Sequence, residues 1–257
     1  MSETITGRDW AAVRAVIEDG HRDEPTAGVP WSVLEGLAGL VPCDLAVMAD
    51  GDYVRGRQRM SQDVDADGRR RLRVSADPAG TPSTNPEVWK GVRDFAVCSY
   101  GERTGDFARV TRFTDFYSER QLRGVPIYND WWAPAGGRFG MCMSLLACVP
   151  AQRRKIFFWR SCGPDFTDRE RQLVELLRPH IWEIYNEGRQ RREPLPHLTA
   201  REWEVLRLAD QGLGNAEIAA ALFISVATVR KHFDNIFDRT GVRTRAAAAA
   251  KMLPPYR

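Results

Sequence analysis

The segment 197–257 contains helix-capping residues at short intervals, and no other feature constrains the fold of this chain more. Candidate N-cap residues, each followed by apolar residues at helical spacing, are Thr199, Asn215, Ser225 and Thr244. Glu202 completes a capping box with the first of them, while Gly212 and Gly241 are suited to end the first and third helices. The segment therefore predicts four short helices. Two of them, joined by a tight turn, form a helix-turn-helix.

The excess positive charge of the chain lies in this same segment. The 257 residues include 37 Lys and Arg against 34 Asp and Glu, which gives a formal net charge of +3. The segment 197–257 holds nine basic and six acidic residues, so residues 1–196 are neutral overall. This balance excludes a polybasic protein and favours a tail that binds nucleic acid. The stretch 189–196, which is rich in charge and proline, predicts a linker between domains of residues 1–188 and 197–257.

Several separated blocks of the tail resemble the LuxR-type DNA-binding domain: LTARE at 198–202, NAEIA at 215–219, SVATVRKH at 225–232, NI at 235–236 and GVRTR at 241–245. This resemblance implies an all-α four-helix domain in which the helix over 225–239 enters the major groove of duplex DNA and the last helix aids dimerisation. Two positions depart from the family pattern. Ala216 lacks the basic side chain that is common before Glu217, and Asp234 stands where a basic or small polar residue is frequent.

Residues of the third helix and of the neighbouring turns are the candidates for contact with DNA. Arg230 and Lys231 lie in the half of the helix that reaches base edges. Arg can bond guanine in a bidentate manner, whereas Lys makes a less directional contact. His232 fits a phosphate contact and local packing equally well. Residues at helix starts and turns suit contacts with phosphate: Asn215, Thr228, Arg243 and Arg245.

Residues 1–188 predict a mixed domain with helices on either side of a mainly antiparallel sheet. Asp9 and Pro30 are suited to begin two helices. Strands are expected over 45–48, 70–74, 140–149 and 155–160, with helices over 86–96 and 118–123. The last two strands are expected to form a hairpin that turns at 149–152.

A long helix closes this domain. Thr167 and Glu170 form a capping box at its start, Pro179 is expected to kink it or break it in two, and Gly188 is expected to end it. The order of elements and the region 165–180 resemble a GAF-like sensor domain. The fold class expected for the chain is therefore α+β, a GAF-like domain followed by the all-α domain.

Aromatic residues of this domain suggest a pocket for a small molecule. Flat apolar side chains commonly line ligand pockets, and a connection flanked by Pro and Gly is a frequent place for ligand contacts. The candidate ligand-binding residues are Trp89, Tyr128, Trp131 and Trp132. Aromatic residues at such spacings are also common in a plain hydrophobic core, so both interpretations stay open.

Asp50 follows a buried strand and so imitates the phosphorylated aspartate of a phosphoreceiver domain. Such a site needs further carboxylates on an earlier strand to hold Mg²⁺, yet the residues upstream predict helices. No lysine follows a later strand at a suitable place. We therefore interpret Asp50 as a turn residue beside Gly51. A degenerate receiver-like input is retained as an alternative.

This sequence lacks the motifs that are typical of several other classes of protein. The cysteines have no CxxC spacing, and we expect them to be reduced core residues without a metal or cofactor: Cys43, Cys98, Cys142, Cys148 and Cys162. No P-loop, HExxH, nucleophile elbow or dinucleotide fingerprint is present, so we expect no enzyme. With neither a signal peptide nor an apolar run of about 18 residues, we expect a cytoplasmic protein without membrane contact.

These observations favour a sequence-specific transcription regulator that acts as a one-component homodimer. Its expected partners are double-stranded DNA, a second copy of the chain and a small-molecule effector sensed by the first domain, with RNA polymerase as a further candidate. The alternative is that the first domain only mediates oligomerisation or protein interaction. A specific ligand would separate these hypotheses, because it stabilises a sensor by mass action.

Overall fold

The computed structural model describes residues 4–52, 56–77, 80–82, 86–145, 152–192 and 196–252. They fall into two compact units, one that ends at Arg192 and one that begins at residue 196. Each unit has its own hydrophobic core. Within these ranges we find no helix that combines the length and the apolar character needed to cross a bilayer.

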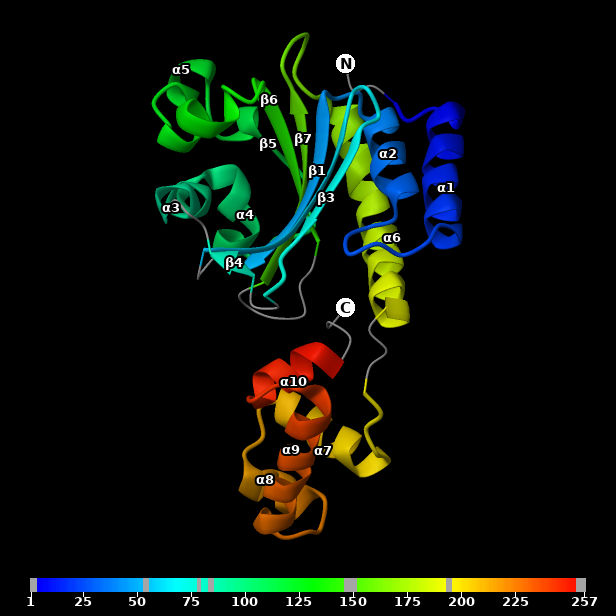
Figure 1. Ribbon diagram of the computed structural model, residues 1–257, viewed down its shortest axis with the longest axis vertical. Helices are drawn as coiled ribbons and strands as arrows, with labels where there is room; N and C mark the ends of the chain where they lie inside the picture. Colours follow the sequence, from blue (N-terminus) through cyan, green and yellow to red (C-terminus); the bar gives the residue numbers. More distant parts are fainter. Residues whose placement is uncertain are drawn as a thin grey trace. The chain divides into compact units, whose positions relative to one another are not determined.

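A seven-stranded antiparallel sheet forms the centre of the first unit (Figure 1). Its strands are β1 (Leu45–Asp52), β2 (Arg57–Asp65), β3 (Arg70–Val74), β4 (Thr81–Pro82), β5 (Thr111–Arg112), β6 (Phe139–Leu145) and β7 (Gln152–Arg160). Their order is β3-β2-β1-β7-β6-β5, and β4 pairs with β2. β1 and β7 form the central pair, with Val47 opposite Phe157 and Leu45 opposite Trp159. This pairing joins the start of the domain to its end.

The predicted strands are confirmed where the structure describes them, but the sequence analysis missed three others. β1 is longer than predicted, and the turn expected at 149–152 lies for the most part outside the described residues. The missed strands are β2, β4 and β5. β2 contains the buried Met60 and Val64, but Gln62 between them hides the alternation. The Gln62 amide tolerates burial because both of its polar groups are hydrogen-bonded. It donates to the carbonyl of Val29 at 2.8 Å and accepts from the N–H of Val29 at 3.0 Å.

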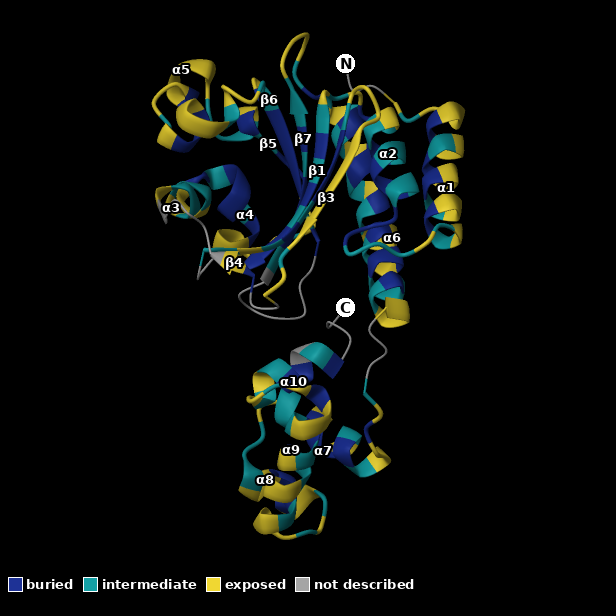
Figure 2. Cartoon of the chain, viewed as in Figure 1, coloured by how far each residue is buried: buried dark blue, intermediate teal, exposed yellow. Residues whose placement is uncertain are grey.

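Two groups of helices cover the two faces of the sheet (Figure 1). On one face lie α1 (Gly7–Arg22), α2 (Trp31–Leu40) and α6 (Asp168–Arg192), and on the other α3 (Pro86–Asp94), α4 (Ala96–Thr104) and α5 (Glu119–Leu122). The first interface is an aliphatic core that includes Leu37, Met48 and Leu177. The second is rich in aromatic rings, among them Phe95 and Phe113. Figure 2 shows the buried residues of α2, α4 and α6 mainly on the sides that face the sheet.

Helix α1 begins three residues earlier than the predicted cap implies. Thr6, not Asp9, is its N-cap, and the Asp9 carboxylate accepts a hydrogen bond from the N–H of Thr6 at 2.7 Å. Asp9 also binds Arg169 of α6, whose Nε lies 3.0 Å from Oδ2. The prediction of Asp9 as the cap was wrong because a capping box uses both positions, and the sequence analysis assigned the cap to the second of them.

Helix α6 is a single helix of 25 residues, so it does not break at Pro179, which was one of the two outcomes expected there, and the predicted end at Gly188 is wrong. Packing of the apolar stripe that contains Leu177 and Ile181 against the core outweighs the one backbone hydrogen bond that proline removes. Gly188 is buried against Pro25, where a Cβ would lie 3.1 Å from that ring. Residues 189–192, which the sequence assigned to a linker, continue the helix, since Arg and Gln are good helix formers and cations suit a helix C-terminus.

The second unit contains the four predicted helices, α7 (Ala200–Asp210), α8 (Asn215–Ala221), α9 (Val226–Thr240) and α10 (Arg245–Met252). The expected caps at Thr199, Ser225 and Thr244 are confirmed. The predicted cap at Asn215 is wrong, because Gly214 is the N-cap and its N–H donates to the Glu217 carboxylate at 2.7 Å. The sequence therefore predicted the order and type of these helices correctly.

Asp50 is not a turn residue. It lies within β1, is buried, and its Oδ2 accepts a hydrogen bond from Nε of Arg154 at 2.9 Å. The ring of Tyr185 lies 4.9 Å from the guanidinium of the same arginine. Across the strands, the Asp50–Arg154 pair thus ties the sheet to α6.

The cysteines differ in their surroundings. Cys98 and Cys142 are buried, and burial raises the pKa of the Cys142 thiol to about 11, which keeps it protonated at neutral pH. Cys43 is half-buried, and burial raises the pKa of its thiol to about 12. Cys162 is exposed, so the expectation of a core position is wrong there, and Cys148 lies outside the described residues.

Replacing Asp9 by Asn should lower the free energy of unfolding at neutral pH. Hydrogen bonds from Arg169 and Thr6 lower the pKa of Asp9 from 3.8 to about 2. A carboxyl group with a lowered pKa contributes stability above its unfolded-state pKa and loses it as the pH falls through the folded-state pKa. The stability difference between the natural protein and Asp9→Asn should therefore shrink from about pH 4 to about pH 2 in urea denaturation.

The matched control for this prediction is Asp19→Asn. Asp19 lies on the same helix in an exposed pair with Arg22, and such pairs contribute little. A stability difference for Asp9→Asn that stays constant down to pH 2 would contradict the role of its charge.

Candidate nucleic-acid interface and ligand cavity

The turn between α8 and α9 is held by local hydrogen bonds. Ser225 Oγ accepts from the N–H of Thr228 at 3.0 Å and caps α9. Arg201 of α7 donates to the carbonyl of Leu222 at the end of α8. Phe223 takes a left-handed conformation with φ of 54°, and its side chain is 95% exposed. These contacts determine where α9 begins.

The inner side of α9 packs into the core of the second unit. Val229, Phe233 and Ile236 are buried at helical spacing, together with residues of α7, α8 and α10. This packing determines which side of the helix faces outward.

The outward side of α9, which we call the reading face, consists of Val226, Ala227, Arg230, Lys231 and Asp234, all exposed. Arg230 and Lys231 thus lie where the sequence analysis required them. Among the described residues, none forms a hydrogen bond or an ion pair with either side chain. The first turn of α9 contains no acidic residue, so the free N–H groups at its N-terminus favour a nearby anion.

The structure brings together two of the candidate phosphate contacts, Asn215 and Arg245. Arg245 Nη2 donates to Oδ1 of Asn215, and its guanidinium lies 4.5 Å from the ring centroid of Phe233. Both residues are half-buried. They therefore also hold the start of α10 against α8 and α9, a role that sequence reasoning missed.

The other candidate residues of this unit occupy different positions. Arg243 is exposed, while Thr228 and His232 are half-buried on α9. The Thr228 hydroxyl lies 2.8 Å from that of Ser225. Arg239, near the end of α9, donates to the carbonyl of His197 at 2.8 Å and so holds the start of the unit against this helix.

A cavity of about 220 Å³ lies between the sheet of the first unit and α3. Its lining includes Val47 of β1, Trp89 of α3, Trp132, and Phe157 and Trp159 of β7. The rings of Trp132 and Trp159 are 5.4 Å apart and nearly perpendicular. The candidate ligand-binding residues chosen from the sequence include Trp89 and Trp132 but not Trp159. Its signal was the alternation around the buried Phe158, which places Phe157 and Trp159 together on the opposite face.

The Trp159 indole adds a polar group to this cavity wall, which Asp50 and Gln58 also line. Its Nε1 is buried and has no hydrogen-bond partner within the part of the chain that the structure describes. The other two ligand candidates lie elsewhere. Tyr128 is buried in the aromatic core, 6.1 Å from Phe113, and Trp131 is 48% exposed at the rim of a separate groove beside Asp94.

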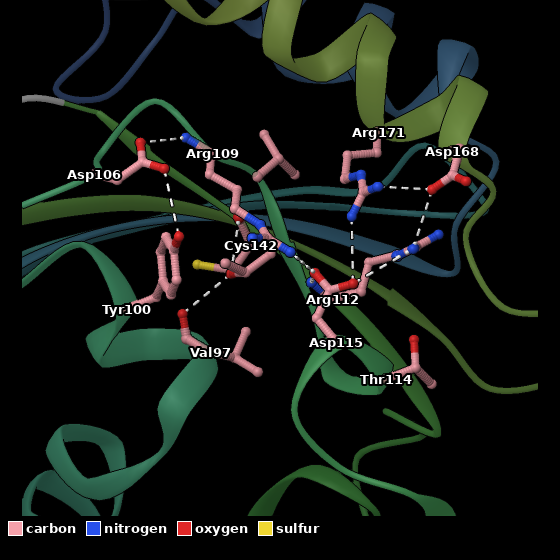
Figure 3. A network of polar contacts seen from close by, with 12 residues as sticks. Val97, Tyr100, Asp106, Arg109, Arg112, Thr114, Asp115, Cys142, Asp168 and Arg171 are labelled. Carbon is pink, nitrogen blue, oxygen red and sulfur yellow. Dashed lines mark hydrogen bonds and ion pairs between the residues drawn. The ribbon is translucent and has the colours of Figure 1, made fainter. Parts of the chain in front are cut away.

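A polar network links the aromatic side of the sheet to α6 (Figure 3). Phe113, which begins the 3₁₀ turn Phe113–Asp115, stacks on the cavity residue Trp132 at 5.6 Å. At the end of that turn, the buried carboxylate of Asp115 binds Arg171 of α6 at 3.3 Å and Arg112 at 3.4 Å. Arg112 in turn lies 3.2 Å from Asp168 at the start of α6. The network therefore connects the cavity wall to the first turns of α6.

Comparison with known proteins identifies the family of the second unit. Residues 196–252 match the model for "Bacterial regulatory proteins, luxR family". Over 58 residues the chain is 45% identical to the spore germination protein GerE of Bacillus subtilis. The aligned residues make up 23% of this chain and 78% of GerE. The chain belongs to the LuxR family of bacterial regulatory proteins.

Other relatives of this LuxR-family chain are similar to it over only part of their sequences. It is 47% identical over 58 residues to the probable transcriptional regulatory protein SgaR of Hyphomicrobium methylovorum, covering 23% of this chain and 28% of SgaR. It is 33% identical over 91 residues to the monoamine regulon transcriptional regulator of Klebsiella aerogenes, covering 35% of this chain and 40% of that protein. The LuxR-family chain thus spans less than half of either relative.

The fold is shared over nearly the whole LuxR-family chain. The crystal structure of SdiA from Escherichia coli matches with a TM-score of 0.50 at 15% identity, covering 94% of this chain and 95% of SdiA. The predicted fold class, a GAF-like antiparallel sheet with flanking helices followed by a helical LuxR-type unit, is confirmed.

Arg245→Ala should destabilise the second unit by about 1 to 2 kcal/mol, because it removes the hydrogen bond to Asn215 and the cation over Phe233. Arg243→Ala removes the same charge from an exposed position and serves as the control. Thermal unfolding of the full chain should give a lower Tm for Arg245→Ala only. Equal Tm values for both variants would show that the contacts of Arg245 contribute nothing measurable.

Proposed function

We propose that this LuxR-family protein is a sequence-specific transcription regulator that binds duplex DNA through α9. The observation that supports this most directly is the reading face, where Arg230 and Lys231 are exposed and unpaired within the described part of the chain. A single α-helix fits the major groove, and its N-terminal half reaches base edges. The named function of the matched relatives as transcriptional regulators agrees with this proposal.

The candidate residues divide into base and phosphate contacts. Arg230 is suited to bind O6 and N7 of a guanine in a bidentate manner, with Lys231 as a second, less directional base contact. The phosphate candidates lie on α9 or near the starts of α8 and α10: Asn215, Thr228, His232, Arg243 and Arg245. Arg243 is the most available of these, since it is exposed.

The protein acts as a homodimer in this proposal. Two copies of α9 would occupy successive major-groove segments about 34 Å apart on a pseudo-palindromic site. RNA polymerase is a candidate partner at promoters that contain such a site.

The first unit is proposed to bind a small molecule in the cavity beside α3. Three indole rings, those of Trp89, Trp132 and Trp159, surround a space of about 220 Å³. The unpartnered N–H of Trp159 offers one hydrogen bond to an acceptor on the ligand, and a buried donor without a partner is costly. A compact, flat and mainly apolar molecule with a carbonyl or similar acceptor fits these walls best.

Signal transfer in this proposal uses the polar network of Figure 3. A ligand in contact with Trp132 would shift Phe113, which stacks on Trp132. The turn that begins at Phe113 ends at Asp115, and Asp115 binds Arg171 of α6. Helix α6 leads along the chain to the DNA-binding unit. Ligand binding changes DNA binding only if the ligand has different affinity for two arrangements of these elements.

Arg230→Ala should weaken binding to the preferred duplex by about 1 to 3 kcal/mol and reduce the preference for it over random DNA. Arg243→Ala should weaken binding to both duplexes alike, since a phosphate contact does not depend on sequence. Competition between a selected duplex and random duplex at fixed salt measures both effects. Equal losses on the two duplexes for Arg230→Ala would remove its role in base recognition.

Trp159→Phe should weaken binding of any ligand found by a thermal-shift screen about tenfold, the value of one hydrogen bond to a buried group. Phenylalanine keeps an aromatic wall but lacks the N–H. Titration calorimetry with the identified ligand measures the change, and Trp131→Phe, outside the cavity lining, is the control. An unchanged affinity for Trp159→Phe would place the ligand elsewhere.

A further inference from the structure

Asp234 is an acidic residue at the C-terminal end of the reading face. Its side chain is exposed on the same side of α9 as Arg230 and Lys231, which lie four and three residues earlier. Asp234 forms no salt bridge with either of them. Among the described residues, none donates a hydrogen bond to this carboxylate or forms an ion pair with it.

A carboxylate on this face is unfavourable unless it finds a hydrogen-bond donor on DNA. The phosphates that flank the groove repel it, and the polar groups on the major-groove edges of guanine and thymine are acceptors, which a carboxylate cannot bind. The N4 amino group of cytosine is a donor without a neighbouring acceptor on that base, and Asp or Glu is the side chain that accepts from it. The chemistry of Asp234 therefore selects cytosine.

The helix geometry gives the position of that cytosine. Each residue advances about 1.5 Å along an α-helix, so Asp234 lies about 6 Å beyond Arg230 along α9. Base pairs are about 3.4 Å apart along each strand of the duplex. The base that Asp234 reaches is consequently one or two base pairs from the base that Arg230 reaches.

We infer that Asp234 is a specificity-determining residue that accepts a hydrogen bond from N4 of a cytosine, one or two base pairs from the base contacted by Arg230. The inference rests on the proposed DNA-binding function and adds a base and a position to it. It also gives Asp234 a second effect, which is to lower affinity for random DNA through repulsion of phosphate.

Asp238 provides a matched control on the same helix. It is exposed, carries the same charge and has no hydrogen bond or ion pair to a described residue. It lies four residues farther from the N-terminus of α9, away from the end that reaches base edges. Asp234→Ala and Asp238→Ala therefore remove equal charge, but only the first removes the proposed base contact.

The experiment is selection of bound duplexes from a randomised library by the full-length natural protein and by Asp234→Ala, Asp234→Asn, Asp238→Ala and Arg230→Ala. Asp234→Ala should lose the preference for cytosine at one position of each half-site by about tenfold while other positions keep theirs. Asp234→Asn should shift that position toward adenine, to which an amide can bond through N6 and N7. Asp238→Ala should leave the selected motif unchanged, and Asp234→Ala and Asp238→Ala should both bind random DNA more tightly, because each removes a negative charge.

The outcomes separate the two proposals. A natural protein that selects no motif at all would overturn the proposed function, and this inference with it. A motif that is selected but is the same for the natural protein and Asp234→Ala would overturn the inference alone. The inference also fails if Asp234→Ala and Asp238→Ala change the motif equally, or if the positions altered by Asp234→Ala and Arg230→Ala lie more than two base pairs apart. Folding of each variant is checked by its Tm.

Discussion

The antiparallel pairing of β1 with β7 is the interaction on which the first unit depends. It joins residues 45–52 to residues 152–160 and so places the two central strands side by side, although most of the unit lies between them in sequence. Because side chains alternate along each strand, this single register assigns Met48 and Phe158 to one face and Val47 and Trp159 to the other. A slip by one residue would exchange the aliphatic core with the cavity wall.

The two faces of the sheet have different chemistry, and this difference separates stability from the candidate function. Against α1, α2 and α6 the sheet presents close-packed aliphatic side chains, and the Asp50–Arg154 pair lies at the margin of this core. Against α3, α4 and α5 it presents aromatic rings, and a cavity lies beside α3 on this side. Asp115 and Arg171 connect the second side with the helix of the first.

The second unit shows why local sequence signals succeed in small helical domains. Its caps and glycines act on neighbours three to five residues away, and its core is built from helices that follow one another closely in the chain. The outward position of Arg230 follows from the same periodicity that buries Val229 and Phe233. Arg245 was harder to interpret, since its contacts with Asn215 and Phe233 join three helices.

The sequence by itself determined the helical tail, its order of helices, the exposed basic residues of α9 and four of the strands, because each depends on periodicity and capping within a few residues. Only the tertiary structure decided that β2 is a strand, that α6 passes through Pro179 and Gly188, and that Trp159 rather than Tyr128 or Trp131 joins Trp89 and Trp132 at the cavity. These features depend on contacts between residues far apart in the chain. The Gln62 amide needs the backbone of Val29, which no local pattern reveals. Alternation along β7 gives the face on which Trp159 lies, but the cavity beside it also needs α3 opposite β7.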